Sequence, residues 1–176
     1  IIPDTIARRS HQFETNADGA ATADPHRLAR LTDECIDEVL AHPAAQSLEN
    51  VGMATFVGNM LGIDSNGKPL TPLFTYADTR SRDAISSISW NPQSCHKRTG
   101  APQHTAYRRE QLHWLQQTQP DLVSTVAEWI DFGTFIYRKW LGKDVPCSYS
   151  VASWSGLLNR EEVTWDQELL SHLDLT

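Results

Sequence analysis

Strand-like and helix-like segments alternate along this chain, and that alternation limits its fold more than any other feature. Small apolar runs over 51–56, 60–64 and 73–77 are typical of buried strands. Before them, Asp24 and Pro25 provide a helix cap and a first helical residue, and apolar residues then recur at helical spacing up to His42. Strands alternating with helices predict an α/β domain with a mixed sheet flanked by helices.

Turn and breaker residues set the remaining expected elements. Asn66-Gly67 is a strong turn signal, and the runs 51–56 and 60–64 are close enough to form a hairpin, so part of the sheet should be antiparallel. Residues 148–158 are expected to be extended or irregular. A further strand is predicted over 1–13, and helices over 80–90, 107–118, 126–140 and 165–173, with Pro92 breaking the first of these and Gly142 ending the third.

Composition excludes several classes of protein. The 176 residues suffice for one domain, and 40% apolar residues can build a core. The net charge of −7 and the absence of a basic cluster argue against a nucleic-acid partner, and no apolar run reaches the length of a membrane span. Three widely spaced cysteines predict reduced thiols in a cytoplasmic protein. A chain that begins with Ile1 is expected to be a fragment.

No complete catalytic motif is present. The sequence contains no Gly-rich phosphate loop ending in Gly-Lys-Ser/Thr, no HExxH helix and no GxSxG turn. The seven histidines are scattered and form no metal-ligand spacing with the cysteines. We therefore predict no catalytic residue and no metal ligand within these residues.

One constellation has the chemistry of a polyol site. Tyr76, Asp78 and Arg80 directly follow a predicted strand, and alternate residues of an extended segment project from one side. A carboxylate accepts hydrogen bonds from hydroxyls, a guanidinium donates them, and a ring covers a carbon face. The alternative is an aspartate that caps the next helix, with the arginine on its surface. Gly58 and Asn59 either allow a ligand to approach the backbone or simply form a turn.

In its order of motifs the chain resembles the FGGY carbohydrate kinases, which include glycerol, xylulose and gluconate kinases. The resemblance runs over nearly the whole chain. The matching segments follow in chain order, with the family's pattern in quotation marks. The first are Asp18-Gly19 with Asp24-Pro25, the apolar run 51–56, the Asp64 to Leu70 turn segment ("D-x-x-G-x-P-L") and Tyr76-x-Asp78-x-Arg80 ("W-x-D-x-R"). The others are Thr99-Gly100 with His104 and Tyr107 ("TG…H-x-x-Y"), Leu112 to Leu115 ("K-L-x-W-L"), Trp140 to Gly142, and Ser150 to Ser153 followed by Trp165-Asp166 ("S-x-A-S…W-D"). Phe56, His104 and Tyr107 favour the gluconate-kinase-like branch.

The resemblance implies an actin-like (ribonuclease H-like) ATPase domain whose sugar lies in a cleft between two domains. It makes Gly58, Asn59, Tyr76, Asp78, Arg80 and Tyr107 candidates for the sugar pocket or for the residues that support it. Departures from the family pattern affect specificity. Tyr76 replaces a tryptophan, charged substrate-reading residues are replaced by Phe56, Val57 and Gly58, and Gln111 replaces a lysine, where a surface role is expected.

The resemblance further implies that residues 1–176 are part of the N-terminal domain of an ATP-dependent sugar kinase that uses Mg²⁺. The phosphate-binding "D-x-G-T" turn, the catalytic aspartate and the adenosine site are expected in the first strands and the C-terminal domain, which this chain lacks. Its partners would be a sugar or polyol and that C-terminal domain, and the fragment alone is predicted to bind no cofactor and to be inactive. The alternatives are a non-catalytic sugar-binding or regulatory protein on half of a kinase scaffold, and a generic α/β interaction domain.

Overall fold

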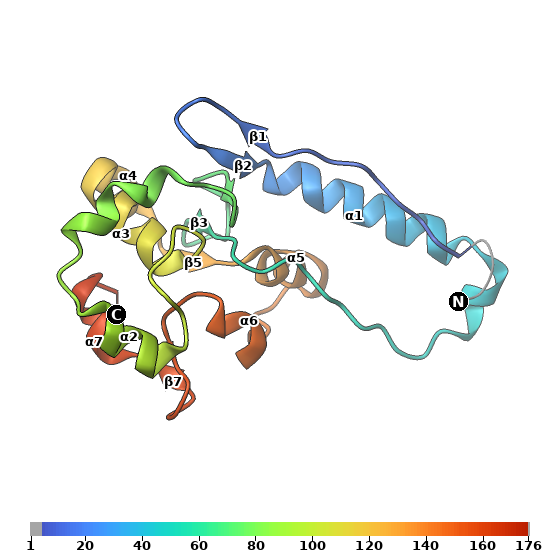
Figure 1. Ribbon diagram of the computed structural model, residues 1–176. Coiled ribbons are helices and arrows are strands. Elements are labelled where there is room, and N and C mark those ends of the chain that lie inside the picture. The colour runs from blue at the N-terminus through green and yellow to red at the C-terminus, as the bar shows by residue number, and fades with distance from the viewer. Residues whose placement is uncertain (1–4, 176) are drawn as a thin grey trace.

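A computed structural model describes residues 5–175 and combines helices with three small antiparallel sheets (Figure 1). One sheet has the order β1-β2-β4, and the other two pair β3 with β5 and β6 with β7. The strands are β1 Glu14–Thr15, β2 Ala21–Ala23, β3 Leu61–Ile63, β4 Leu73–Phe74, β5 Glu128–Ile130, β6 Leu158–Asn159 and β7 Thr164–Trp165. The α/β class is confirmed, and every strand pair among residues 5–175 is antiparallel, whereas a mixed sheet was expected.

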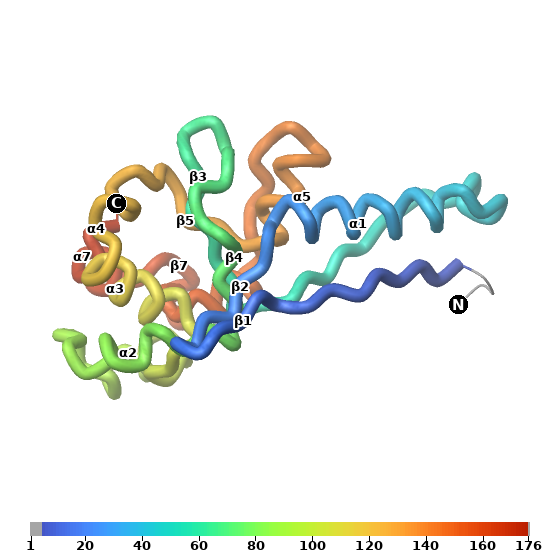
Figure 2. The backbone as a smooth tube through the Cα atoms, turned by 90° about the horizontal axis from the view of Figure 1, so that it is seen from above, coloured from blue at the N-terminus to red at the C-terminus, as the bar shows by residue number. Residues whose placement is uncertain are grey.

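The helices differ greatly in length, and the longest, α1, lies in an arm of the molecule together with the segments before β1 and after η1, which run alongside it (Figures 1 and 2). The α-helices are α1 Pro25–Leu40, α2 Pro92–Thr99, α3 Arg108–Thr118, α4 Pro120–Thr125, α5 Phe132–Leu141, α6 Tyr149–Ser153 and α7 Gln167–His172; the short 3₁₀ helices are η1 Pro43–Ser47, η2 Arg80–Arg82 and η3 Ala84–Ser87. Within residues 5–175 no helix has the length and apolarity needed to cross a membrane.

Helices with strong local signals form where the sequence predicts them. Asp24 caps α1 by accepting hydrogen bonds from the N–H groups of His26 and Arg27, and Asp166 caps α7. The expected helix over 107–118 is α3, and Gly142 ends α5 in the left-handed conformation. These elements depend on residues within one or two turns of each other.

Elements that depend on distant partners were predicted less well. The hairpin over 51–64 is wrong, because 51–56 forms no strand and β3 pairs instead with β5, Leu61 opposite Ile130. The helix predicted over 126–140 is wrong in its first part for the same reason. Residues 128–130 pair with β3, and Asp131 then caps a separate helix by accepting from the N–H of Thr134.

Three further predictions are corrected. The helix over 80–90 consists of the two short helices η2 and η3, and Asn91 and Pro92 begin α2 rather than end a helix, because Asn91 accepts a capping hydrogen bond from Ser94. Residues 5–13 form no strand, and residues 1–4 of that prediction lie outside the described part of the chain. The 148–158 segment contains α6, capped by Ser148.

Two apolar clusters form the core. One joins α1, β3, β5 and α5 through residues such as Leu28, Leu61 and Ile136. The other joins β4 to α2, α3 and α7 around Met60 and Leu112. The loop after β4, which carries the predicted polyol-binding residues, is therefore anchored to buried elements.

Candidate functional site

The loop after β4 turns sharply instead of continuing as an extended segment. The Thr75 hydroxyl donates to the backbone oxygen of Ala21 at 2.8 Å, and the N–H of Asp78 donates to the backbone oxygen of Thr75 at 3.1 Å. This turn sends Tyr76 outward, with 51% of the residue exposed, and Asp78 inward, with 2% exposed. The expectation that Tyr76, Asp78 and Arg80 project from one side is wrong, because the rule of alternate residues does not hold in a turn.

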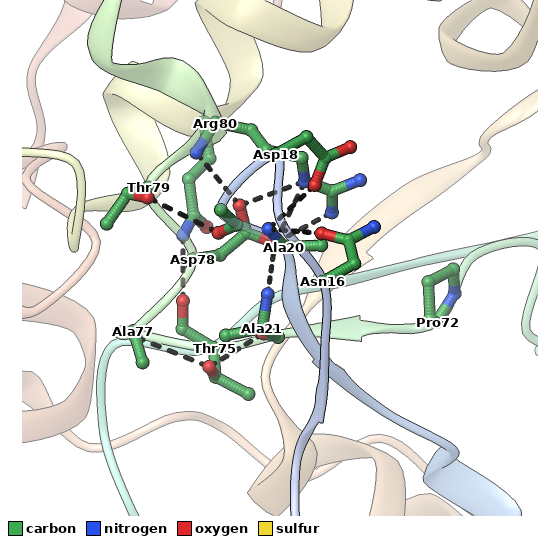
Figure 3. Close-up of polar contacts among 12 residues, drawn as sticks. Asn16, Asp18, Ala20, Ala21, Pro72, Thr75, Ala77, Asp78, Thr79 and Arg80 are labelled. Carbon is green, nitrogen blue, oxygen red and sulfur yellow. Dashed lines mark hydrogen bonds and ion pairs between the residues drawn. The ribbon is translucent and has the colours of Figure 1, made fainter.

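Asp78 is the centre of a buried polar network (Figure 3). Its carboxylate accepts from the N–H of Ala21 at 3.2 Å and from Nε and Nη2 of Arg80 at 3.1 and 2.7 Å. It also accepts from the N–H of Arg80, where η2 begins. These bonds join the loop after β4 to strand β2. The N-cap residue of η2 is Thr79, so Asp78 is not the cap of the next helix, and its carboxylate is buried rather than exposed.

Arg80 is held on both sides of its guanidinium. Besides the ion pair with Asp78, its Cζ lies 4.7 Å from the ring centroid of Trp114 and 5.5 Å from that of Phe74. A planar guanidinium over an aromatic face is a stabilising arrangement. The N–H groups of Arg80 thus donate to Asp78, and its guanidinium plane lies against the rings of Trp114 and Phe74.

Gly58 provides space next to Tyr76. Its φ is +65°, and a Cβ at this position would lie 3.0 Å from the Cβ of Tyr76 and 3.3 Å from the backbone oxygen of Ala106. The residue that follows Ala106 is Tyr107. The structure therefore brings Gly58, Tyr76 and the segment that carries Tyr107 together.

Asn59 is buried and links three segments. Its side-chain amide donates to the backbone oxygen of Phe56 at 2.6 Å, and its Oδ1 accepts from the N–H of Phe132 at 2.7 Å. The backbone oxygen of Asn59 accepts from Arg108 at 3.2 Å, and burial lowers the pKa of that guanidinium while the charge of Asp131 acts in the opposite direction. Asn59 fixes the turn before β3 to the start of α5.

Tyr76 and Tyr107, whose segments meet at Gly58, each contact a further aromatic ring. Phe13 lies edge-on to Tyr76 with ring centroids 6.1 Å apart, and it also contacts Phe56 at 6.3 Å. Tyr107 is stacked on Trp154 at 6.1 Å with an interplanar angle of 18°. Phe13 and Trp154 were not predicted from the sequence, although Trp154 directly follows the "S-x-A-S" segment that carried part of the resemblance.

The six predicted residues thus fall into two groups. Tyr76 and Tyr107 contact Phe13 and Trp154, two aromatic contacts that we call together the outer aromatic surface, and Gly58 is buried between the segments that carry the two tyrosines. Asn59, Asp78 and Arg80 use their polar atoms to hold the backbone. Gln111, expected at the surface, is 3% exposed and donates to the backbone oxygen of Thr75 at 3.1 Å, because that carbonyl lies inside the fold. None of the six lines the apolar cavity of about 450 Å³ beside α1, which Phe56 does line.

Comparison with known proteins identifies the class of this fold. Over 96% of the chain it superposes, with a TM-score of 0.85 and 24% identity, on 34% of a gluconate kinase from Lactobacillus acidophilus. Over 94% of the chain it superposes, with a TM-score of 0.78 and 18% identity, on 35% of a glycerol kinase from Plasmodium falciparum solved with ADP. The fold is therefore the actin-like, ribonuclease H-like fold of these kinases.

Sequence comparison narrows the class to one family. The chain is 28% identical over 165 residues to a gluconokinase from Bacillus subtilis, covering 93% of this chain and 30% of that protein. It is 26% identical over 172 residues to a rhamnulokinase from Yersinia pestis, covering 95% and 34%. The model of the FGGY family of carbohydrate kinases, N-terminal domain, matches residues 5–176, and the chain belongs to this family. It spans about a third of the length of these relatives.

Proposed function

We propose that this chain is the sugar-binding part of an ATP-dependent carbohydrate kinase, which transfers a phosphoryl group from ATP to a sugar hydroxyl. The observation that carries the proposal is the family match over residues 5–176, supported by relatives named for gluconate and rhamnulose phosphorylation. Because the chain spans about a third of those relatives, we propose that residues outside it supply the rest of the active site.

The residues present do not fit Mg-ATP. Phosphoryl transfer requires groups that cradle the phosphates, and carboxylates that hold the metal. Among residues 5–175 no three His, Cys, Asp or Glu side chains gather in a way that could hold a metal ion, and Asp78 is already paired with Arg80. We therefore assign no step of the transfer to this chain and expect residues 1–176 alone to give no turnover.

The outer aromatic surface is the part of the chain that we assign to the sugar. The rings of Tyr76 and Tyr107 offer apolar faces to carbon-bound hydrogens, and their hydroxyls donate and accept hydrogen bonds. Gly58 lets the segments that carry Tyr76 and Tyr107 approach each other, because a Cβ there would meet Tyr76 and the backbone oxygen of Ala106. Asn59, Asp78 and Arg80 act beneath this surface, because their bonds fix the turns that carry Gly58 and Tyr76.

The test is a substrate panel on the full-length protein that contains this chain. Gluconate, rhamnulose, xylulose and glycerol are offered with Mg-ATP, and ADP release is measured. Tyr76→Ala should raise KM for the accepted sugar about three- to tenfold, the value of one lost aromatic contact. Trp165→Ala is the matched control, since Trp165 is 43% exposed on β7 and has no place in the proposed site.

Two results would contradict the proposal. If the full-length protein binds a sugar but releases no ADP with any member of the panel, the non-catalytic sugar-binding alternative holds. If a sugar is phosphorylated and Tyr76→Ala leaves its KM unchanged, the enzyme class stands and the pocket assignment is wrong.

A further inference from the structure

Two adjacent charged residues, Arg109 and Glu110, are buried at the start of α3. Arg109 is 1% exposed and Glu110 is completely buried, and Arg109 donates to Oε1 of Glu110 from Nη2 at 2.6 Å and from Nε at 2.9 Å. Removing two charges from water costs more than their attraction usually returns, so a buried pair is weak evidence for a purely stabilising role. Their position needs another explanation.

Arg109 connects two loops that are far apart in the sequence. Its guanidinium donates to the backbone oxygen of Pro102 at 3.1 Å and to that of Gly156 at 3.3 Å, and its own N–H donates to Ser155 at 3.2 Å. Glu110 occupies the remaining side of the guanidinium and so directs the other N–H groups toward these carbonyls. The 101–107 loop and the turn after α6 are thereby fixed to one side chain.

These same loops carry the stacked pair Tyr107 and Trp154. Tyr107 ends the first loop, and Trp154 lies two residues before Gly156 in the second. A Cβ on Gly156, whose φ is +73°, would lie 3.4 Å from the Cβ of Tyr107, so the two loops approach closely at this point. Trp154 remains 44% exposed and can offer its ring to a ligand.

Building on the function proposed above, we propose that Arg109 and Glu110 are positioning residues for the sugar substrate, and that they hold Tyr107 and Trp154 as a preformed aromatic platform, next to the point where the backbone of Ala106 approaches Gly58. The platform would contact the carbon face of the sugar. A site whose rings are already oriented loses less entropy on binding, and a small displacement of a binding group weakens the complex measurably. Arg109 and Glu110 touch no substrate and act only through the two loops.

The test uses the full-length kinase and the double variant Arg109→Met with Glu110→Leu. Replacing both members of a buried ion pair leaves no unpaired charge, whereas the carbonyls of Pro102 and Gly156 lose their donor, so we expect this variant to fold with a lowered melting temperature. We expect KM for the sugar to rise about three- to tenfold, with kcat and KM for ATP unchanged within about twofold. Arg138→Met with Glu128→Gln is the matched control, because that ion pair lies on α5 and β5 outside the platform.

A second variant keeps the test decisive if the double variant does not fold. Trp154→Ala alters a residue that is 44% exposed and should also raise the sugar KM about three- to tenfold. When Trp154→Ala is combined with the Arg109 and Glu110 changes, the effects should not add, because both remove the same platform. A merely structural role would instead lower the melting temperature and leave the sugar KM unchanged.

The outcomes separate this inference from the proposed function. A folded double variant with the wild-type sugar KM overturns it, and so does a Trp154→Ala variant without effect. If Tyr76→Ala raises the sugar KM while these variants do not, only the role of Arg109 and Glu110 is refuted. If no sugar is phosphorylated by the full-length protein, the proposed function fails and this inference fails with it.

Discussion

Asp78 and Tyr76 should respond to mutation in opposite ways, although they are two residues apart. Asp78→Asn keeps the shape of the side chain but removes the charge that pairs with Arg80 and weakens the bond from the N–H of Ala21. Breaking a buried pair costs about 3–5 kcal/mol. Because Arg80 retains some contact with water and asparagine keeps one acceptor oxygen, we expect a loss of about 2–3 kcal/mol in the free energy of unfolding.

For a domain of this size, each kcal/mol lowers the melting temperature by about 2–4 °C. Thermal denaturation of the full-length protein should therefore show the unfolding transition of this domain about 5–10 °C lower in Asp78→Asn than in the wild type, with a smaller rise in the sugar KM than Tyr76→Ala causes at a temperature well below the transition. Asp83→Asn is the control, because Asp83 is exposed and its side chain makes no capping hydrogen bond. An unchanged melting temperature together with a raised sugar KM would show that Asp78 contacts the sugar, and would refute the structural role argued above.

Two other perturbations follow from the same loops. Burial raises the pKa of Glu110 from 4.5 to about 7 against the lowering effect of Arg109, so between these pH values the unfolded chain releases a proton that the folded chain keeps. The free energy of unfolding should therefore fall as pH rises through that window. Denaturation of wild type and Glu110→Gln at pH 5 and 7.5 should show this fall only in the wild type, and an equal fall in both proteins would contradict the expectation. Gly58→Ala should lower the melting temperature by a few degrees and raise the sugar KM, because φ is +65° and the new Cβ would meet Tyr76. A variant with the wild-type melting temperature and sugar KM would show that the close approach has no role. Gly67→Ala is the control that separates backbone strain from this contact, because Gly67 has a φ of +79° and open space around it.

How much of the fold the sequence could predict depends on the distance over which each signal acts. Asp24, Asp166 and Gly142 are local signals, and the helix ends they predict are confirmed. The apolar pattern over 126–140 fits one long helix equally well, and only pairing with β3, more than sixty residues earlier, makes 128–130 a strand. Such pairing leaves no mark in the local pattern, because Trp129 and Ile130 suit a buried strand as well as a helix.

The run 51–56 shows a different limit. Its small apolar residues are of the kind found in buried strands, but a strand exists only when its backbone groups are paired. Within residues 5–175 the N–H groups of 51–57 donate no hydrogen bond to a backbone acceptor, and Val51 is 89% exposed. The residue types of 51–56 are compatible with a strand, but the predicted pairing of this run with 60–64 is wrong.

In the candidate site, too, local features could be predicted from the sequence and features that depend on distant residues could not. The sequence could indicate which residue types gather near Gly58, since a glycine, a tyrosine and a polar cluster follow one another in order. It could not indicate in which direction each side chain points. The direction of Asp78 depends on the bond between Thr75 and Ala21, which lie 54 residues apart.

Arg109 and Glu110 were beyond any local rule, because two charged residues at a helix start normally face water. They are buried because the carbonyls of Pro102 and Gly156 point inward and need donors that no neighbouring backbone N–H provides. A guanidinium can reach both carbonyls at once, and a carboxylate beside it balances the charge. The cost of burying this pair is thus the cost of fixing two irregular loops, which carry Tyr107 and Trp154.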